Sequence, residues 1–527
     1  MTAADRDDAV TTGSPFVPDT SLPLIDVSIA EHLRHQAETF PDRPALIWDD
    51  GGVRTLDYRQ LLAAVEALAV ELAGLADPGD RIAVWSANSP QWVILECACA
   101  LSATVVTGFN TAWSDAEVSH ALDLTAPKAL FVAEDNRGVD LRPRAARLAG
   151  ARSHCQVIDL AGVETEAAPS GAARVLPRPG PDDAFLIQFT SGTTGRAKGA
   201  VLSHRTVLNA GYFRAVAVGA DPTDVWVNPS PLHHMGGSVS MVFAAFSTGG
   251  CYVVLPRFSP AYQVDLMRRV GATRTGGVPT MLYALLEVPG FEEVLKSIRS
   301  VGLGGTSVAP SLVERLQSYG ANVSISYGQS ECPAVSNTPD WADAETAAST
   351  VGTITSHTEL RLLGPDGSPV GPGRIGEVCV RSPFTMIGYH DMPEVTAQTI
   401  DPEGFLHTGD LGSLDERGLL RIQGRVREMI IRGGENIYPI EVEDVLLRHP
   451  AVEAVAVIGT PSERWGEEVA AVVRPAPGLA VTAEELEAHA GSALAHFKVP
   501  RQWRFVESFP LTASGKIRKV ELGALFG

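Results

Sequence analysis

Residues 184–199 read AFLIQFTSGTTGRAKG, an apolar run that leads into a loop of three glycines, four hydroxyl residues and a lysine. The apolar run over 184–189 predicts a buried strand. In such a loop, glycines let successive backbone N–H groups turn inward, hydroxyls donate to phosphate oxygens, and Lys198 adds a positive charge. The stretch is therefore typical of a strand followed by a phosphate-binding loop, although plain turns share this composition.

This loop is not a Walker A loop. That motif is G-x-x-x-x-G-K-[ST], whereas here Lys198 comes three residues after Gly195 and precedes Gly199. The phosphate-binding hypothesis therefore needs support from motifs elsewhere in the chain.

Helix and strand patterns alternate before the loop. Residues 58–75 predict an amphipathic helix and 92–103 a second helix, while 82–87 and 104–109 predict buried strands. Buried strands that alternate with helices are typical of parallel sheets covered by helices. The sequence therefore predicts an α/β fold on this side of the loop.

The pattern changes after the loop. Short strands alternate with Gly, Pro and Asp turns over 360–422, which predicts antiparallel hairpins in a small β-barrel-like subdomain. The last hundred or so residues predict a small α+β unit, and the segment 424–439 lies between it and the larger part. We therefore predict a large N-terminal domain of parallel-rich sheets over 21–426, and a small mobile α+β domain over 427–527.

Composition limits the class of protein. The 527-residue chain is too long for one compact core and predicts about two to four folding units. Its formal net charge is -20, and no run of Lys or Arg offers a basic face, which argues against nucleic-acid binding. Because this charge would repel a polyanionic ligand, the positive field around such a ligand must be local.

The cysteines and the N-terminus indicate the compartment. The six cysteines are scattered along the chain, which favours small core residues in a reducing compartment. The first residues, MTAADRDDAVTTGSPF, lack the basic and apolar regions of a signal peptide. No apolar run reaches the roughly 20 residues of a membrane helix. We therefore expect a cytoplasmic protein without a membrane span, disordered over residues 1–20.

Seven further motifs follow the loop in a fixed order. The loop resembles the T-S-G-[ST]-T-G-x-P-K-G signature of the adenylate-forming superfamily, with Ala197 in place of the proline. This superfamily includes acyl-CoA synthetases, aryl-CoA ligases, luciferases and peptide-synthetase adenylation domains, and the chain looks most like a stand-alone bacterial acyl-CoA synthetase. The other matching motifs are PLHH (231–234), GGT (304–306), YGQSE (327–331), HTGDL (407–411), GRVR (424–427), GGENIYP (433–439) and SGK (514–516).

The resemblance implies an ATP site. Glu331 is expected to bind Mg²⁺, because a carboxylate beside three phosphates would be repulsive without a cation. Asp410 can accept hydrogen bonds from the ribose hydroxyls, and Arg425 can donate to the ribose or to phosphate. Ile422 matches an apolar position that lines the adenine, with a plain core residue as the alternative. The residues assigned to ATP binding are Thr190, Ser191, Gly192, Thr193, Thr194, Gly195, Lys198, Gly304, Gly305, Thr306, Ser326, Tyr327, Gly328, Gln329, Ser330, Asp410, Ile422 and Arg425.

The resemblance also implies two half-reactions. A carboxylate attacks the α-phosphorus of ATP to give acyl-AMP and pyrophosphate, and a thiol then displaces AMP. Lys516 is expected to bridge the acid and the α-phosphate, because negative charge accumulates where these two anions meet. The small domain is expected to rotate about Arg427, presenting Lys516 first and the strand with Gly433 and Gly434 second. Those glycines would line the tunnel for the thiol arm, where a Cβ would collide.

The acid pocket is assigned by the same resemblance. His234 borders the pocket and is a third catalytic candidate with Lys516 and Glu331, whereas His233 is more typical of a core residue. No acidic residue occurs over 235–246, which argues against an α-amino acid. Apart from His234, the expected pocket residues are small or apolar, which leaves volume and favours a medium-to-large, mainly hydrophobic acid. They are His234, Met235, Gly236, Gly237, Met241 and Gly302.

Several alternatives stay open. The chain ends eleven residues after Lys516, so no fused carrier domain is expected, and CoA or a separate carrier protein would accept the acyl group. Adenylation without thioester formation is a further possibility. A luciferase-like monooxygenase shares these motifs, and a non-catalytic adenylate-binding protein would be expected to lack Lys516 or Glu331.

Overall fold

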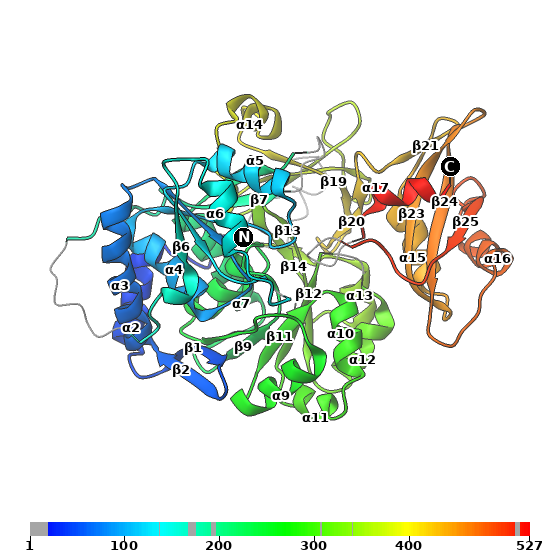
Figure 1. The fold of residues 1–527 in the computed structure, drawn as a ribbon. Helices are drawn as coiled ribbons and strands as arrows, with labels where there is room; N and C mark the ends of the chain where they lie inside the picture. The colour runs from blue at the N-terminus through cyan, green and yellow to red at the C-terminus, as the bar shows by residue number, and fades with distance from the viewer. Residues whose placement is uncertain are drawn as a thin grey trace.

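The computed structural model describes residues 19–135, 137–166, 175–190, 196–305, 308–339, 341–511 and 517–526. Figure 1 shows a large part drawn in blue to yellow and a small orange and red part at its right. Helices cover mixed sheets in the large part, and the small part is α+β. The predicted α/β class with one large and one small part is confirmed.

The predicted phosphate loop follows a strand of a seven-stranded sheet, ordered β18-β8-β7-β4-β3-β5-β6. The strands from β7 to β6 run parallel, whereas β8 and β18 are antiparallel to their neighbours. The strands of this sheet are β3 (Arg81–Trp85), β4 (Val105–Gly108), β5 (Ala129–Val132), β6 (Gln156–Asp159), β7 (Ala184–Thr190), β8 (Lys198–Ser203) and β18 (Gly388–Tyr389).

A second, nine-stranded sheet has the order β15-β14-β13-β12-β11-β9-β10-β1-β2. Its strands from β13 to β1 run parallel, and β2, β14 and β15 are antiparallel. The strands are β1 (Pro44–Asp49), β2 (Val53–Asp57), β9 (Val225–Asn228), β10 (Cys251–Val254), β11 (Arg274–Gly277), β12 (Ser300–Gly304), β13 (Asn322–Gln329), β14 (Cys332–Asn337) and β15 (Thr353–Ile354).

The two faces of β12 and β13 differ in side-chain size. Val301, Leu303, Val323 and Ile325 pack into one hydrophobic core. Because successive residues of a strand point to opposite faces, the residues between them, glycines on β12 and serines on β13, line the other face. That face therefore carries only small side chains.

Two antiparallel sheets follow, as the hairpin pattern predicts. The first is ordered β16-β17-β19-β20, and its two edge strands are not paired with each other in the described part of the chain. Its strands are β16 (Glu359–Leu363), β17 (Gly376–Arg381), β19 (Leu406–Leu414) and β20 (Leu420–Arg425). The sheet of the small part is formed by β21 (Ile430–Arg432), β22 (Glu435–Ile437), β23 (Val452–Ser462), β24 (Gly466–Pro475) and β25 (Gln502–Phe505).

Several helices begin where the sequence supplies a side-chain cap. The Asp57 side chain accepts from the Gln60 N–H and the Gln60 side chain from the Asp57 N–H, so α3 spans the predicted residues, Tyr58–Leu75. The other helices are α2 (Ile29–Thr39), α4 (Pro90–Ser102), α5 (Asp115–Thr125), α6 (Arg142–Ala149), α7 (His204–Ala217), α8 (Phe243–Ser247), α9 (Pro260–Val270), α10 (Pro279–Leu286), α11 (Phe291–Leu295), α12 (Pro310–Gln317), α13 (Ala344–Ser349), α14 (Pro393–Thr399), α15 (Pro439–Leu447), α16 (Ala483–Ala493) and α17 (Lys519–Leu522). A π-helical turn covers Ser238–Val242, and 3₁₀ turns cover Leu160–Gly162 and Gly523–Leu525.

The small part has its own hydrophobic core and few links to the large part. Residues 426–429 connect β20 to β21, and α15 packs against β20. An ion pair of 3.2 Å joins Arg448 on α15 to Glu345 on α13, with both side chains more than half exposed. Exposed ion pairs of this kind contribute about 0–1 kcal/mol. The contacts are therefore compatible with relative movement, and the domain boundary and the hinge at Arg427 stay predictions.

Three sequence-based expectations can be compared directly with the fold. All six cysteines are free and buried, as expected of core residues. Within the described part of the chain, no helix has both the length and the apolar character needed to cross a bilayer. The expectation that Gly433 and Gly434 lie in a strand is wrong. They form the turn between β21 and β22, because both have φ in the left-handed region, +61° and +90°.

A buried ion pair stabilises the nine-stranded sheet. Arg274 on β11 donates to Asp224 at 3.0 Å, and both side chains are almost fully buried. We expect Arg274→Met to destabilise the large part by about 3 kcal/mol, because it removes the buried partner of Asp224 and leaves only the half-exposed Arg299, at 3.3 Å, to pair with that charge. A lower urea midpoint by circular dichroism would show this. Arg59→Met, which removes an exposed ion pair with Asp42, should change stability by less than about 1 kcal/mol. Equal midpoints for the two variants would contradict the prediction.

Candidate nucleotide and acid site

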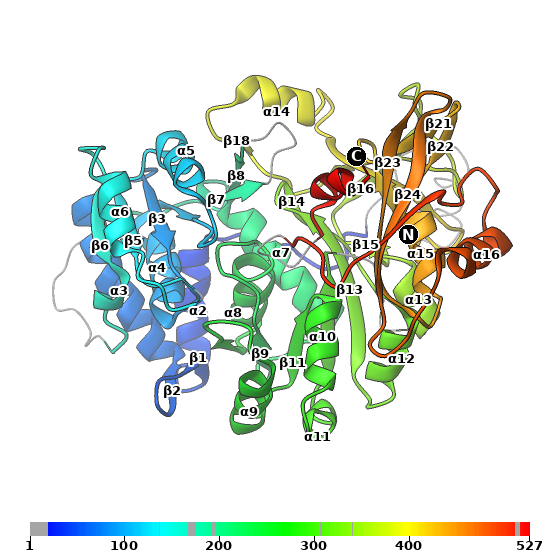
Figure 2. The same cartoon turned by 45° about the vertical axis from the view of Figure 1, so that its right-hand side comes forward.

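Residues from three sheets meet where the sequence predicts the nucleotide. β8 and β18 come from the seven-stranded sheet, β13 from the nine-stranded sheet, and β19 and β20 from the four-stranded sheet. Figure 2 shows β8 and β18 below α14, at the top of the molecule. Seven predicted residues lie outside the described residues, and their roles stay predictions: Ser191, Gly192, Thr193, Thr194, Gly195, Thr306 and Lys516.

The two ends of the glycine loop are side by side. Thr190 at the end of β7 pairs with Lys198 at the start of β8. The Thr190 hydroxyl is buried and has no hydrogen-bond partner among the described residues. The Lys198 Nζ lies 4.0 Å from the centre of the Tyr389 ring. The loop mouth therefore offers an unpartnered hydroxyl and an ammonium group, both suited to a phosphate.

Glu331 lies beside this ammonium group. It occupies the tight turn between β13 and β14, and its Oε1 accepts a 2.6 Å hydrogen bond from the Tyr389 hydroxyl. Burial lowers the pKa of Lys198, Glu331 opposes this shift, and the charge of Arg427 adds to it. Lys198, Glu331 and Arg427 therefore lie close enough to interact electrostatically.

One carboxylate near a phosphate site fits a Mg²⁺ ion, which keeps several waters and takes oxygens from one or two carboxylates and from phosphates. The Oε1 of Glu331 already accepts from Tyr389, and its charge is the local counterpart of Lys198. The residues present are thus compatible with the predicted metal, with Glu331 as the protein ligand.

Asp410 joins the second and third sheets. Its Oδ2 accepts from the Tyr327 hydroxyl at 2.7 Å and its Oδ1 from the Arg425 Nε at 3.1 Å. Asp410 is buried and pairs with Arg425 across β19 and β20. Burial, with the nearby Asp410 charge, raises the pKa of Tyr327. The structure thus brings together three residues that the sequence assigns to one nucleotide, with Ile422 half-buried on the same hairpin.

The remaining predicted nucleotide residues lie at the carboxyl ends of β12 and β13. Gly304 pairs with Ser326 there, and Gly305 follows with φ in the left-handed region, +84°. A Cβ on Gly328 would collide with the Pro333 carbonyl of β14. Ligands of open α/β sheets bind at this end of the strands. Gln329 ends β13, and Ser330 follows it in the turn.

Sequence reasoning missed the group that supports the HTGDL motif. The Glu377 Oε2 lies 3.0 Å from the His407 Nδ1, and its Oε1 accepts from the Gly409 N–H at 3.2 Å. Cys379, two residues along β17, lies 3.5 Å from the same histidine nitrogen. These contacts fix the backbone just before Asp410. The alternation E-x-C in GEVCVR, facing the motif across a hairpin, is the signal that could have identified Glu377.

The PLHH segment and its neighbours form the predicted acid-binding region. The His233 carbonyl accepts from Gln188 of β7 at 2.9 Å, and a Cβ on Gly108 would collide with the His233 backbone. Burial, with a smaller effect of His234, lowers the pKa of His233 to about 3. His233 is therefore packed as a neutral ring, in line with a core role. The His234 Nδ1 accepts from the Gly236 N–H at 3.1 Å.

The predicted pocket wall differs from expectation in one respect. Among the predicted pocket residues, Met235, Gly237 and Met241 are buried. Glycine at 302 was expected to leave empty volume, and this is wrong, because the Arg214 guanidinium occupies the space that a Cβ would need. The pocket wall at 302 is therefore polar rather than open.

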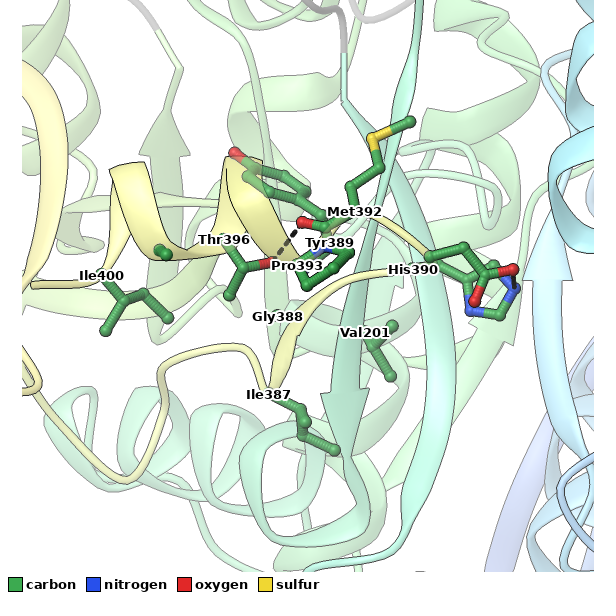
Figure 3. A pocket seen from close by; sticks show the side chains of 11 residues that line it. Val201, Ile387, Gly388, Tyr389, His390, Met392, Pro393, Thr396 and Ile400 are labelled. Carbon is green, nitrogen blue, oxygen red and sulfur yellow. Dashed lines mark hydrogen bonds and ion pairs between the residues drawn. The ribbon is translucent and has the colours of Figure 1, made fainter.

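An open pocket of about 630 Å³ lies on the other side of Tyr389, between β8, β18 and α14. Figure 3 shows Tyr389 above the pocket residues, with Thr396 of α14 holding the turn through the Met392 carbonyl at 2.9 Å. Within the described chain, none of the predicted acid-pocket residues lines it. Tyr389, which lines this pocket, also contacts Lys198 and Glu331.

The chain matches known families over nearly its full length. Residues 33–390 match the family model described as AMP-binding enzyme, and residues 441–516 match that of the AMP-binding enzyme C-terminal domain.

Individual proteins match as well. The chain is similar to 3-[(3aS,4S,7aS)-7a-methyl-1,5-dioxo-octahydro-1H-inden-4-yl]propanoyl:CoA ligase of Mycobacterium tuberculosis, with 34% identity over 92% of this chain and 96% of that protein. It is also similar to the mitochondrial medium-chain acyl-CoA ligase ACSF2 of Mus musculus, with 32% identity over 95% and 88%. Among solved structures, ATP-bound MatB of Rhodopseudomonas palustris has a TM-score of 0.85 and 28% identity, over 94% of this chain and 99% of that one.

The Asp410 contacts generate a prediction about ATP affinity. Asp410→Asn removes the charge that accepts from Tyr327 and Arg425, and with it the acceptor predicted for the ribose. We expect the Kd for ATP, measured by isothermal titration calorimetry, to rise about tenfold or more, the factor for a hydrogen bond to a charged group. Tyr327→Phe, which keeps the ring, should raise it less. An unchanged Kd in Asp410→Asn would reject the ribose assignment.

Proposed function

The chain belongs to the AMP-binding enzyme family, and we propose that the acid it activates has no amino group and is mainly hydrophobic. The enzyme is an AMP-forming acid–thiol ligase with ATP and CoA as substrates. One observation supports the ATP-dependent chemistry most directly: Lys198 and Glu331 both contact Tyr389, and Asp410 accepts from Tyr327 on the strand that leads to Glu331.

The reaction has two balanced steps. An oxygen of the carboxylate bonds to the α-phosphorus of ATP, the bond between that phosphorus and the bridging oxygen breaks, and pyrophosphate leaves. The CoA sulfur then bonds to the acyl carbon, the bond from that carbon to the AMP oxygen breaks, and AMP leaves. The thiol proton goes to solvent or to the released AMP.

The roles of individual residues in these steps are proposals. The Thr190 hydroxyl and Lys198 would bind the β- and γ-phosphates, and Asp410 with Arg425 would hold the ribose. Mg²⁺, when bound at Glu331, would neutralise phosphate charge. Lys516 would hold the carboxylate against the α-phosphate, where two anions must approach. His234 would border the acid near the reacting carboxyl group.

The movement of the small domain and the path of the thiol are proposals as well. The small domain would turn about Arg427, in the four-residue connection that follows β20. The turn at Gly433 and Gly434 would then line the thiol tunnel. A separate carrier protein is the alternative acceptor to CoA.

The test of the proposed function is a screen of carboxylic acids for pyrophosphate release, followed by mass detection of the product formed with CoA. We expect release to require ATP, Mg²⁺ and a non-amino acid. Glu331→Ala should lower release about tenfold to a thousandfold, the range for one electrostatic contact in a transition state. Glu293→Ala, at an exposed glutamate of α11, should leave it unchanged. An α-amino acid as best substrate would overturn the acid assignment, and full activity of Glu331→Ala at limiting Mg²⁺ would overturn the metal assignment.

The half-reactions separate in two variants. Lys516→Ala should lose acyl-AMP formation yet still convert synthetic acyl-AMP and CoA to thioester. Gly434→Leu should form acyl-AMP and accumulate it, because its side chain would block the thiol. Mass detection of adenylate and thioester, started from the acid or from acyl-AMP, distinguishes the two.

The Gly434 variant needs a control for backbone strain. Gly434 has φ near +90° and open space around a built Cβ, so leucine there strains the turn wherever the thiol runs. Gly367 has φ of +77° and equally open space in the loop between β16 and β17. Gly367→Leu should therefore carry a similar strain with both half-reactions intact. Equal loss of both steps in Lys516→Ala and Gly434→Leu, with intact folding, would rule out domain alternation here.

A further inference from the structure

An arginine is buried without a carboxylate behind the predicted acid pocket. Arg214 lies on α7, is only 9% exposed, and forms no ion pair with a described residue. Its Nη1 donates to the Ser326 hydroxyl, and no other hydrogen bond links its guanidinium to the described residues. Its Nε is buried and unpartnered. Buried charges are normally paired, so the guanidinium of Arg214 lacks an acceptor that such a group usually has.

The same face of the sheet holds a second buried arginine, and the hydrogen bonds of this one are made by the protein. Arg274 on β11 is buried as well, and it donates to the Asp224 carboxylate and to the carbonyls of Val218 and Gly219. Burial alone lowers the pKa of Arg214 to about 10. The contrast indicates that Arg214 lacks a partner that the protein itself supplies to Arg274.

The surroundings of Arg214 combine small residues with a second unpartnered polar group. Its Nη2 faces Gly302, where any side chain would collide with it. Ser324 pairs with Gly302 on the same face, and its hydroxyl is also buried and unpartnered. Two donors without acceptors thus face a wall of small residues on β12 and β13.

The missing acceptor lies on the face of β13 opposite the predicted ribose site. Ser326 and Tyr327 are consecutive on β13, so their side chains point to opposite faces. Tyr327 donates to Asp410 of the predicted ribose site on one face, whereas the hydroxyl of Ser326, which the resemblance also assigns to ATP, accepts from Arg214 on the other. α7 also packs against the π-helical turn that follows PLHH, and Met241 of that turn belongs to the predicted acid pocket. Arg214 therefore lies beside the predicted acid pocket, on the face of β13 opposite Asp410.

We propose that Arg214 binds a second oxygen acceptor of the substrate, a carbonyl or carboxylate oxygen at the end of the acid opposite the carboxyl group that is activated. This rests on the proposed function and narrows its acid from simply hydrophobic to hydrophobic with a distal oxygen. A guanidinium donates strongly to such oxygens, and the Ser324 hydroxyl can add a second donor.

The experiment compares matched acids. Straight-chain monoacids of increasing length are each assayed for pyrophosphate release. Each is compared with the keto acid that carries its carbonyl on the carbon next to the chain end, and with the dicarboxylic acid of the same length. We expect the wild type to prefer a keto acid or a dicarboxylic acid over its monoacid by about tenfold or more in kcat/KM, the factor for a hydrogen bond to a charged group. Preference for the dicarboxylic acid over the keto acid identifies the acceptor as an anion.

Three variants test whether Arg214 causes the preference. Arg214→Met should abolish it and raise kcat/KM for the monoacid, because the buried charge is gone. Gly302→Ala, which pushes the guanidinium away, should weaken it. Arg268→Met, at an exposed arginine of α9, should leave it unchanged. Thermal melting establishes folding, and Arg214→Lys, which keeps the charge, replaces Arg214→Met if that variant unfolds, with a reduced preference expected.

The outcomes separate the two proposals. A wild type that favours monoacids, or a preference unchanged in both the Arg214 and Gly302 variants, overturns the role of Arg214 and leaves the ligase function standing. Absence of pyrophosphate release with every acid overturns the proposed function itself, and this inference with it.

Discussion

The two-residue period of β13 divides the site into two chemical environments. Tyr327 points toward Asp410 and Arg425, and its neighbour Ser326 points toward Arg214. One strand therefore presents an anion-centred network on one face and a cation on the other. Because β13 pairs with β12 in fixed register, neither network can shift without moving the other. The separation of the Asp410 network from Arg214 follows from this backbone constraint.

Charge on the nucleotide side is arranged locally, as a chain of net charge -20 requires. Lys198 lies over the Tyr389 ring, and the Tyr389 hydroxyl donates to Glu331. The phenol thus separates the ammonium from the carboxylate while it contacts both. This arrangement keeps the two charges from simply neutralising each other, so each remains accessible to a polyanion and its metal. Burial, with the nearby Glu331 charge, raises the pKa of Tyr389, which keeps this hydroxyl a donor.

Much of the fold could be predicted from local pattern, and much of the site could not. The helix at Tyr58–Leu75 and the strand at Ala184–Thr190 follow from periodicity and capping, which are properties of neighbouring residues. The motifs located Asp410 and Arg425, but not their pairing. Tyr389 contacts Glu331, which is 58 positions away in the sequence. Arg214 contacts Ser326, which is 112 positions away. No local period encodes such contacts. The family resemblance implies a strand at Gly433 and Gly434, whereas their φ values make them a turn.

A side chain at position 302 would collide with the Arg214 guanidinium, which couples two positions that are 88 residues apart in the chain. A larger residue at 302 fits only after the guanidinium has gone, whereas loss of the guanidinium alone leaves a void beside a glycine. If this pocket changes in evolution, the arginine must therefore be substituted before the glycine. An enzyme that descends from this one and accepts a different acid should carry both exchanges, and an intermediate form should be the less stable of the three because of its unfilled cavity.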